Sequence, residues 1–141
     1  LGMTKNTKKV ALFSALTAKF DAGEIIVVDD ITLDTYKTSA MVKMLKALGC
    51  EKEVSVTYKD AETKKIFDET GKRTCKRRTA TVAEKALVVL PEVNAFVVKS
   101  CANIPGVVTT LSTNINVYEV LNAEKVVMTR AAVEKLQEVY A

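Results

Sequence analysis

Apolar residues along the chain recur at two spacings, one typical of amphipathic helices and one typical of buried strands. The helical spacing predicts a first helix from about residue 4 to Gly23, and a second that Thr38 caps and Gly49 ends. The apolar residues of these two helices are Val10, Leu12, Phe13, Leu16 and Phe20 in the first, and Met41, Val42, Leu45 and Leu48 in the second.

Runs of aliphatic residues predict four strands, at residues 24–30, 85–90, 107–111 and 125–129. The first run is bounded by charges, which is typical of a buried strand. Helices fill the gaps: one breaks at Ile104-Pro105-Gly106, a short one precedes residue 125, and Thr129 caps the last. The apolar residues of these three helices are Phe96, Val97 and Cys101, then Val117, Val120 and Leu121, and then Val133, Leu136 and Tyr140. This alternation predicts a three-layer α/β fold, with a mainly parallel four-stranded sheet and helices on both faces.

The segment from about 53 to 83 departs from this rhythm. Val54, Val56 and Tyr58 alternate at the spacing of a strand, a less regular strand pattern ends near residue 83, and Gly71 provides a turn between them. We expect a small β-hairpin inserted between a helix and the next strand. Residues 1–141 otherwise predict a single α/β domain, because no linker-like composition interrupts them.

Composition limits the class of protein. The chain has 141 residues, 48% hydrophobic and 27% charged, which suffices for one core and excludes wholesale disorder. Because no uninterrupted apolar run reaches the ~18 residues of a membrane span, and the N-terminus is polar and basic, we expect a cytoplasmic protein with no membrane contact. The opening Leu1-Gly2-Met3 is expected to be a cloning remnant or the cut edge of a longer chain.

The chain lacks the residues that several kinds of catalytic, metal and phosphate-binding site require. The chain has no His, so a Ser-His-Asp or Cys-His nucleophile cannot form. Cys50, Cys75 and Cys101 are widely spaced without a CxxC pair, so we expect three free thiols and no metal site. No glycine-rich phosphate loop follows any predicted strand. We therefore expect no enzyme and no cofactor.

The net charge of +4 is concentrated in two basic islands, which favours a polyanionic partner. The first island carries Lys5, Lys8, Lys9 and Lys19 with no acid before Asp21. The second lies in the predicted hairpin and consists of Lys72, Arg73, Lys76, Arg77 and Arg78. Two interpretations of the hairpin cations stay open: contact with a phosphate backbone, or a solvated hairpin tip. The second island contains no aromatic residue, which disfavours base stacking there.

An alternative function is a receiver-like signalling domain with a magnesium site at Asp29 and Asp30, which follow the first strand. That family also needs a phosphate-accepting Asp and a Lys after later strands. Here the later strands end in Pro91-Glu92 and Thr129-Arg130. We therefore expect the two aspartates to be turn residues that bind no catalytic metal. If their strands are neighbours, Arg130 is expected to approach the acid pair.

Four segments together resemble the family of the fourth large-subunit ribosomal protein of bacteria. The first, "KKVALFSALTAKFDAGEIIVVDDI", is similar to that family's basic helix, its "ALxSALS" core and its "GELIVLDD" strand. The others are "YKTSAMVKMLKALG", "KALVVLPEVNAFVVKSCANIPGV" and "NVYEVLNAEKVVMTRAAVEKLQE". Their order and spacing match over about 110 of the 141 residues, which no single short motif achieves.

The resemblance implies a structural protein that binds large-subunit ribosomal RNA, supports subunit assembly and contacts neighbouring ribosomal proteins. It also implies messenger leader RNA as a second RNA partner, because some members repress their own operon. Carried over by position, the RNA-facing residues are Lys5, Lys8 and Lys9, then Lys37 before the second helix, and more weakly Lys19. Residues 53–83 have no expected counterpart, and Ala102 stands where an arginine is usual. The family's extended loop at the exit tunnel has no match in these residues.

Overall fold

The computed structural model describes residue 2, residues 4–57 and residues 77–140; for residues 52–57 and 77–83 only the backbone is described. Two compact units result, one formed by residues 1–50 with 83–141 and one by residues 51–82. The helices are α1 (Lys5–Asp21), α2 (Thr38–Ala47), α3 (Ala95–Ala102), α4 (Val117–Asn122) and α5 (Arg130–Tyr140). The strands are β1 (Ile25–Val28), β2 (Glu51–Thr57), β3 (Arg77–Ala83), β4 (Ala86–Leu90), β5 (Val107–Leu111) and β6 (Lys125–Thr129).

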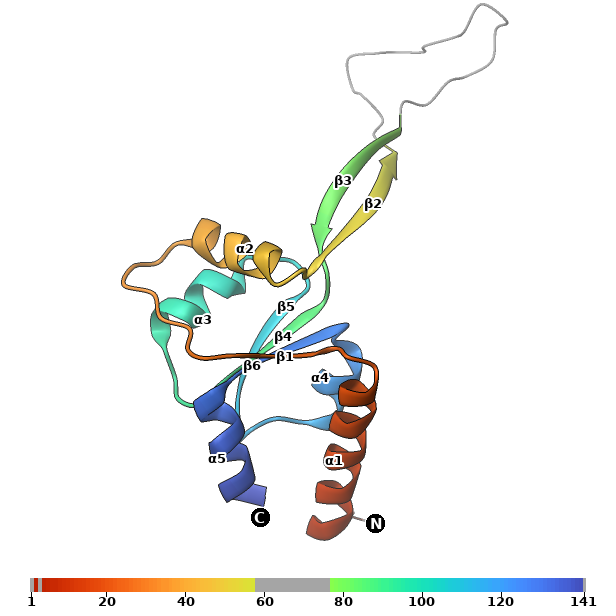
Figure 1. The fold of residues 1–141 in the computed structure, drawn as a ribbon, viewed down its shortest axis with the longest axis vertical. Helices are drawn as coiled ribbons and strands as arrows, with labels where there is room; N and C mark the ends of the chain where they lie inside the picture. Colours follow the sequence, from red (N-terminus) through yellow and green to blue (C-terminus); the bar gives the residue numbers. More distant parts are fainter. Residues whose placement is uncertain (1, 3, 58–76, 141) are drawn as a thin grey trace, which may run out of the picture. The chain divides into compact units, whose positions relative to one another are not determined.

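The larger unit is built on a parallel sheet with the strand order β1-β6-β4-β5 (Figure 1). Val28 of β1 lies opposite Thr129 of β6, so the carboxyl ends of these two strands meet at one edge. The predicted four-stranded parallel sheet is thereby confirmed. The strand order differs from the order along the chain. The last strand, β6, lies between β1 and β4, and β5 forms the far edge.

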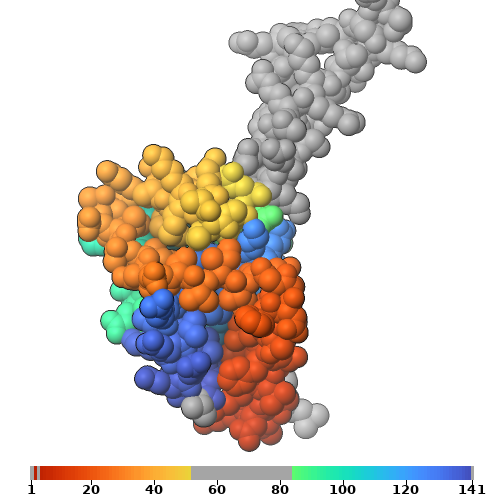
Figure 2. Space-filling view, in the orientation of Figure 1, coloured from red at the N-terminus to blue at the C-terminus, as the bar shows by residue number. Residues whose placement is uncertain are grey.

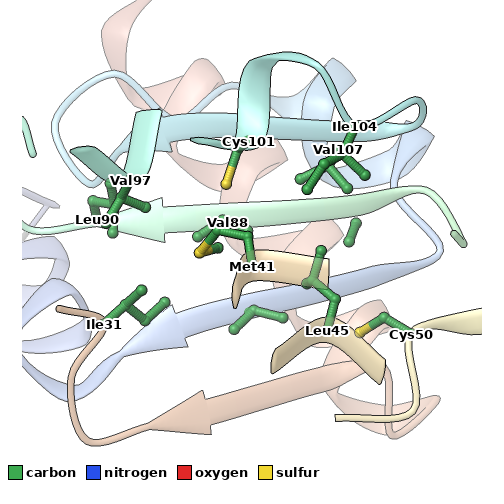
Figure 3. Packing of buried hydrophobic residues seen from close by; sticks show 12 residues of the cluster. Ile31, Met41, Leu45, Cys50, Val88, Leu90, Val97, Cys101, Ile104 and Val107 are labelled. Atoms are coloured by element: carbon green, nitrogen blue, oxygen red, sulfur yellow. The ribbon is translucent and has the colours of Figure 1, made fainter. Parts of the chain in front are cut away.

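Helices cover both faces of the sheet, and each face has its own core. On β4, Val88 and Leu90 point into a cluster with Met41 and Leu45 of α2 and Val97 of α3 (Figure 3). The alternate β4 residues point into the other cluster, which packs against α1, α4 and α5; its β4 and helical members include Leu87, Val89, Leu12, Val120 and Leu136. Because side chains alternate across a strand, a strand buried on both faces is apolar throughout, and all five β4 residues are buried. The expected three-layer α/β fold is confirmed.

Several helix ends follow the chemistry expected from the sequence. Gly23 and Gly49 adopt φ values of 69° and 71°, a left-handed conformation that favours glycine and ends α1 and α2. The Thr129 hydroxyl accepts a hydrogen bond of 3.2 Å from the Ala132 amide, so Thr129 caps α5 as predicted. The predicted cap of α2 was wrong by one residue: Lys37 is the N-cap, without a side-chain hydrogen bond, and Thr38 is the first helical residue.

Two burial patterns differ from the sequence interpretation. We expected a buried first strand, but β1 is an edge strand and its Val27 is 58% exposed. In α1, Leu12 and Ala15 form the buried face, whereas Val10 and Phe20 are exposed. Helical spacing identifies these elements correctly, but it does not reveal which neighbour covers which face.

The smaller unit contains a two-stranded sheet of β2 and β3, as expected for the inserted hairpin. β2 begins two residues before the predicted start. The predicted turn at Gly71 lies outside the described residues. Within the part of the chain that the structure describes, no helix is long and apolar enough to cross a membrane.

Candidate nucleic-acid interface

Helix α1 presents the first predicted RNA-binding residues. Lys5 and Lys8 are exposed and Lys9 is half-buried, all within the first two turns of the helix. Thr4 caps the helix by accepting a 3.3 Å hydrogen bond from the Thr7 amide. The first turn contains no acidic residue. Cations at the positive end of a helix dipole cost a few tenths to about 1 kcal/mol, so these lysines do not serve helix stability.

The same three lysines line a hollow of about 590 Å³ between α1, the start of α4 and the end of α5. Its other lining residues include Leu12, Ile115, Val117 and Tyr140. Tyr140 also meets Phe13 of α1 edge-on, with ring centroids 6.1 Å apart. Such a floor suits the aliphatic stems of lysines, which leave their ammonium groups in water. The three cations are thus gathered around one surface depression.

Lys19 is placed differently from the other α1 lysines. Its ammonium lies 2.5 Å from the Glu24 carboxylate, and its side chain is only 14% exposed. Ten residues of helix separate it from Lys9, a distance of about 15 Å along the axis. An intramolecular partner therefore already neutralises Lys19, and we leave it out of the interface.

Lys37 is exposed in the loop before α2. Helix α2 packs on the opposite face of the sheet from α1 (Figure 1), and Figure 2 shows the outer surface of the same view. The backbone amide of Lys37 donates a 3.1 Å hydrogen bond to the hydroxyl of buried Ser100 in α3. The structure therefore fixes the position of Lys37 but does not bring it together with Lys5, Lys8 and Lys9. Any RNA that contacts both groups must reach two faces of the unit.

Sequence reasoning missed a third basic group. Outside the two islands the sequence is slightly acidic, but the fold does not mix its acidic and basic residues evenly. The segments 36–49 and 93–106, which contain α2 and α3, hold no acid and four lysines. These are Lys37, Lys43, Lys46 and Lys99. The layer formed by α2 and α3 is therefore basic, a grouping that only the pairing of these two helices reveals.

The basic run in the hairpin is only partly described. Arg77 and Arg78 begin strand β3, where the backbone alone is described. Lys72, Arg73 and Lys76 lie outside the described residues. Phosphate contact by this run stays a prediction.

The carboxyl edge of the sheet carries the residues of the signalling alternative. Asp29 forms an ion pair of 2.7 Å with Arg130, which confirms the predicted approach of Arg130. The Asp30 carboxylate accepts a 2.7 Å hydrogen bond from the next backbone amide, at Ile31. Both members of the ion pair are more than 70% exposed, so the pair contributes only about 0–1 kcal/mol. Asp29 thus acts as a surface ion-pair partner, and Asp30 accepts a hydrogen bond from the backbone amide that follows it.

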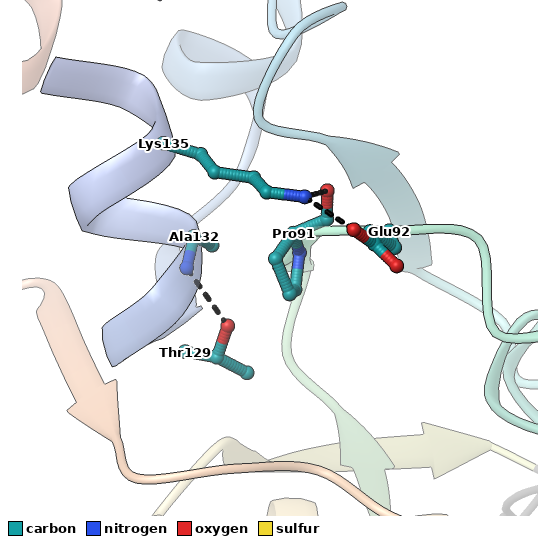
Figure 4. A network of polar contacts seen from close by, with 5 residues as sticks. All are labelled: Pro91, Glu92, Thr129, Ala132 and Lys135. Carbon is teal, nitrogen blue, oxygen red and sulfur yellow. Dashed lines mark hydrogen bonds and ion pairs between the residues drawn. The ribbon is translucent and has the colours of Figure 1, made fainter. Parts of the chain in front are cut away.

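A second ion pair lies at the same edge of the sheet, next to the end of β4. Lys135 of α5 lies 2.6 Å from the Glu92 carboxylate and also donates to the Pro91 carbonyl (Figure 4). The hydrogen bond and charge of Lys135 hold the pKa of Glu92 below its usual value. Among the described residues, no three Asp, Glu or Cys side chains gather in a way that could hold a metal ion. The edge where α/β proteins often bind ligands is occupied here by side-chain pairs.

Two of the three cysteines are buried free thiols, as predicted. Burial raises the pKa of Cys101 to about 11, and burial is also the main cause that raises the pKa of Cys50. Both therefore stay protonated at neutral pH, which makes them packing residues rather than nucleophiles. Cys75 lies outside the described residues.

Comparisons with known proteins agree with the resemblance seen in the sequence. The model of the Ribosomal protein L4/L1 family matches residues 2–139. The large ribosomal subunit protein uL4 of Alkaliphilus metalliredigens is 37% identical over 139 residues, covering 99% of this chain and 52% of the relative. That of Alkaliphilus oremlandii is 36% identical over 137 residues, covering 97% and 51%, and that of Clostridium beijerinckii 34% over 141 residues, covering 100% and 52%. The chain spans about half the length of these curated relatives, and it belongs to the Ribosomal protein L4/L1 family.

Proposed function

We propose that this chain is a non-enzymatic structural component of the large ribosomal subunit that binds structured ribosomal RNA and supports assembly. Family membership and the large-subunit relatives support this role. Neighbouring ribosomal proteins are further partners, messenger leader RNA is a second RNA target, and the cytoplasmic ribosome is the location. This function replaces the receiver-like alternative, because Asp29 is paired with Arg130 and Pro91-Glu92 follows β4 in place of an acceptor aspartate.

The observation that carries the proposal is the lysine group at the start of α1. Within the described part of the chain, no ion pair neutralises Lys5, Lys8 or Lys9. A helix N-terminus adds its own positive potential, so three lysines there create a field that an anion offsets. RNA provides closely spaced phosphates, and each neutralised phosphate releases counterions into solution.

The contacts of this group position the protein rather than read a sequence. Lysine ammonium groups on exposed turns reach phosphate oxygens, which are the same for every nucleotide. Structured RNA is recognised largely by shape, backbone and 2′-hydroxyl groups. The proposed function therefore requires affinity for folded RNA with steep salt dependence.

The test is a salt titration of RNA binding with the triple variant Lys5→Gln/Lys8→Gln/Lys9→Gln. Each lost phosphate contact flattens the slope of log affinity against log salt by about 0.7–0.9, so the triple variant should lose roughly 2–3 units of slope. A control variant lowers the net charge equally at exposed positions without removing a lysine: Ala131→Glu, Asn122→Asp and Gln137→Glu. Equal slopes in wild type and triple variant would refute the assignment of α1.

A further inference from the structure

Two aromatic side chains from distant segments meet on the surface of the α2 and α3 layer. The rings of Tyr36, in the loop before α2, and Phe96, in the first turn of α3, have centroids 4.7 Å apart and are tilted by 47°. Tyr36 is 56% exposed and Phe96 is 37% exposed. The ammonium of Lys99, one turn further along α3, lies 5.1 Å from the centre of the Tyr36 ring. The pair is therefore an accessible aromatic surface with a cation beside it.

Hydrogen bonds fix the backbone on both sides of this pair. Beside Tyr36, the Lys37 amide donates to the hydroxyl of Ser100, which is 2% exposed. The Phe96 amide donates a 3.0 Å hydrogen bond to the Asn94 side chain, which caps α3. A backbone that is already anchored adds little to the entropy lost when a ligand packs on its side chains. The aromatic pair is thus organised before any partner arrives.

The surrounding charge indicates the chemistry of the partner. The α2 and α3 segments hold four lysines and no acid; the ammonium of Lys99 lies over the Tyr36 ring, and Lys37 follows Tyr36 in the chain. Asp34 is the nearest acid in sequence to Tyr36. A neutral apolar partner gains nothing from this positive field, whereas an anionic partner with a flat ring uses both the cations and the aromatic faces.

We propose that Tyr36 and Phe96, with Lys99 over the Tyr36 ring and Lys37 next to Tyr36 in the chain, form a stacking site for an unpaired nucleotide of the bound RNA. The inference rests on the proposed function and adds a second type of contact to it. The lysine that covers the Tyr36 ring marks the face that an incoming base takes, and its flexible stem lets the ammonium move to the phosphate of that nucleotide. Stacking on aromatic side chains tolerates every base, so the site selects unpaired RNA rather than a sequence.

The experiment compares two RNA probes with the intact chain. One is a hairpin whose unpaired loop carries the fluorescent base 2-aminopurine, and the other is the same stem closed by a polyethylene glycol linker. We expect the looped RNA to bind about tenfold more tightly, and the loop fluorescence to be quenched on binding. Tyr36→Leu and Phe96→Leu should each remove most of this preference and the quenching, while binding to the linker-closed stem stays unchanged.

Tyr118→Leu is the matched control, because Tyr118 is 75% exposed on α4, against the opposite face of the sheet. It should keep both the preference and the quenching. Lys99→Gln should flatten the salt slope for the looped RNA by about 0.7–0.9, which Tyr36→Leu should not do. Equal binding of both RNAs by the wild type, or an equal loss for both in Tyr36→Leu, would overturn the stacking site and leave the pair as a surface for a protein partner. Binding of neither RNA would overturn the proposed function itself.

Discussion

Replacing Ser100 with alanine removes the hydroxyl that joins the loop after β1 to helix α3. That hydroxyl accepts a 3.1 Å hydrogen bond from the Lys37 amide, across 63 residues of sequence, and Ser100 itself is 2% exposed. Alanine fits the same space without one oxygen atom, so the change tests this hydrogen bond with little disturbance of packing.

The expected cost follows from the burial of the two partners. A typical intramolecular hydrogen bond contributes about 0.5–1.5 kcal/mol. Lys37 is exposed, so water reaches its freed amide in part, and we expect Ser100→Ala to lower the free energy of unfolding by about 1 kcal/mol. Ser112 provides the opposite case, because its hydroxyl is fully buried and has no hydrogen-bond partner among the described residues. Removing an unsatisfied hydroxyl relieves a desolvation cost, so Ser112→Ala should be neutral or stabilising by up to about 1 kcal/mol.

Urea denaturation at constant temperature, followed by far-ultraviolet circular dichroism, measures both variants against the wild type. The prediction is a difference of about 1–2 kcal/mol between the two alanine variants, with Ser100→Ala the less stable. Ser100→Ala should also weaken binding to looped RNA, since it loosens the backbone beside Tyr36. A Ser100→Ala variant as stable as Ser112→Ala would show that the hydrogen bond from Lys37 contributes nothing, and the reasoning would be wrong.

Three further predictions concern other parts of the chain. Replacing residues 52–82 with a short glycine joint should leave a cooperatively folded unit, seen as one thermal transition, because the amide of Glu84 already lies 3.1 Å from the carbonyl of Cys50. Loss of that transition would place the hairpin in the main core. The raised pKa of Cys101, about 11 in the fold, makes the unfolded thiol ionise first, so stability is full below about pH 9 and falls between pH 9 and 11. Cys101→Ala should lack this part of the alkaline loss in denaturation at several pH values. Calorimetric titration with magnesium should show no heat for the wild type or for Asp29→Asn/Asp30→Asn; a site lost only in the double variant would revive the signalling alternative.

The helices and strands of the larger unit were predictable because the signals for them lie in residues close together in the sequence. Helical spacing, glycine ends and the Thr129 cap all depend on neighbours within a few residues, and they placed the helices and strands within about two residues. The ion pair of Asp29 with Arg130 was predictable as well, once their strands were taken to be neighbours. Strand ends predicted from local sequence patterns can therefore also predict contacts between residues at a shared sheet edge.

What the sequence did not show depends on long-range packing. An edge strand and a central strand can both be apolar, so nothing local marked Val27 as exposed. The α1 lysines formed a visible run in the sequence. The ion pair of Lys19 with Glu24 depends on the turn between α1 and β1, which the run does not reveal. Tyr36 and Phe96 lie 60 residues apart, so their contact follows from the packing of α2 on α3. The one available signal was an aromatic residue near a lysine in each segment.

Co-sedimentation with large ribosomal subunits in rising salt tests the central claim most directly. The chain should sediment with the subunits at low salt and be released steeply as salt increases, because its proposed contacts are with phosphates. Lys5→Glu/Lys8→Glu/Lys9→Glu should remain unbound under conditions where the wild type sediments. The account is contradicted if the wild type never sediments with the subunits, or if the triple glutamate variant sediments with them as the wild type does.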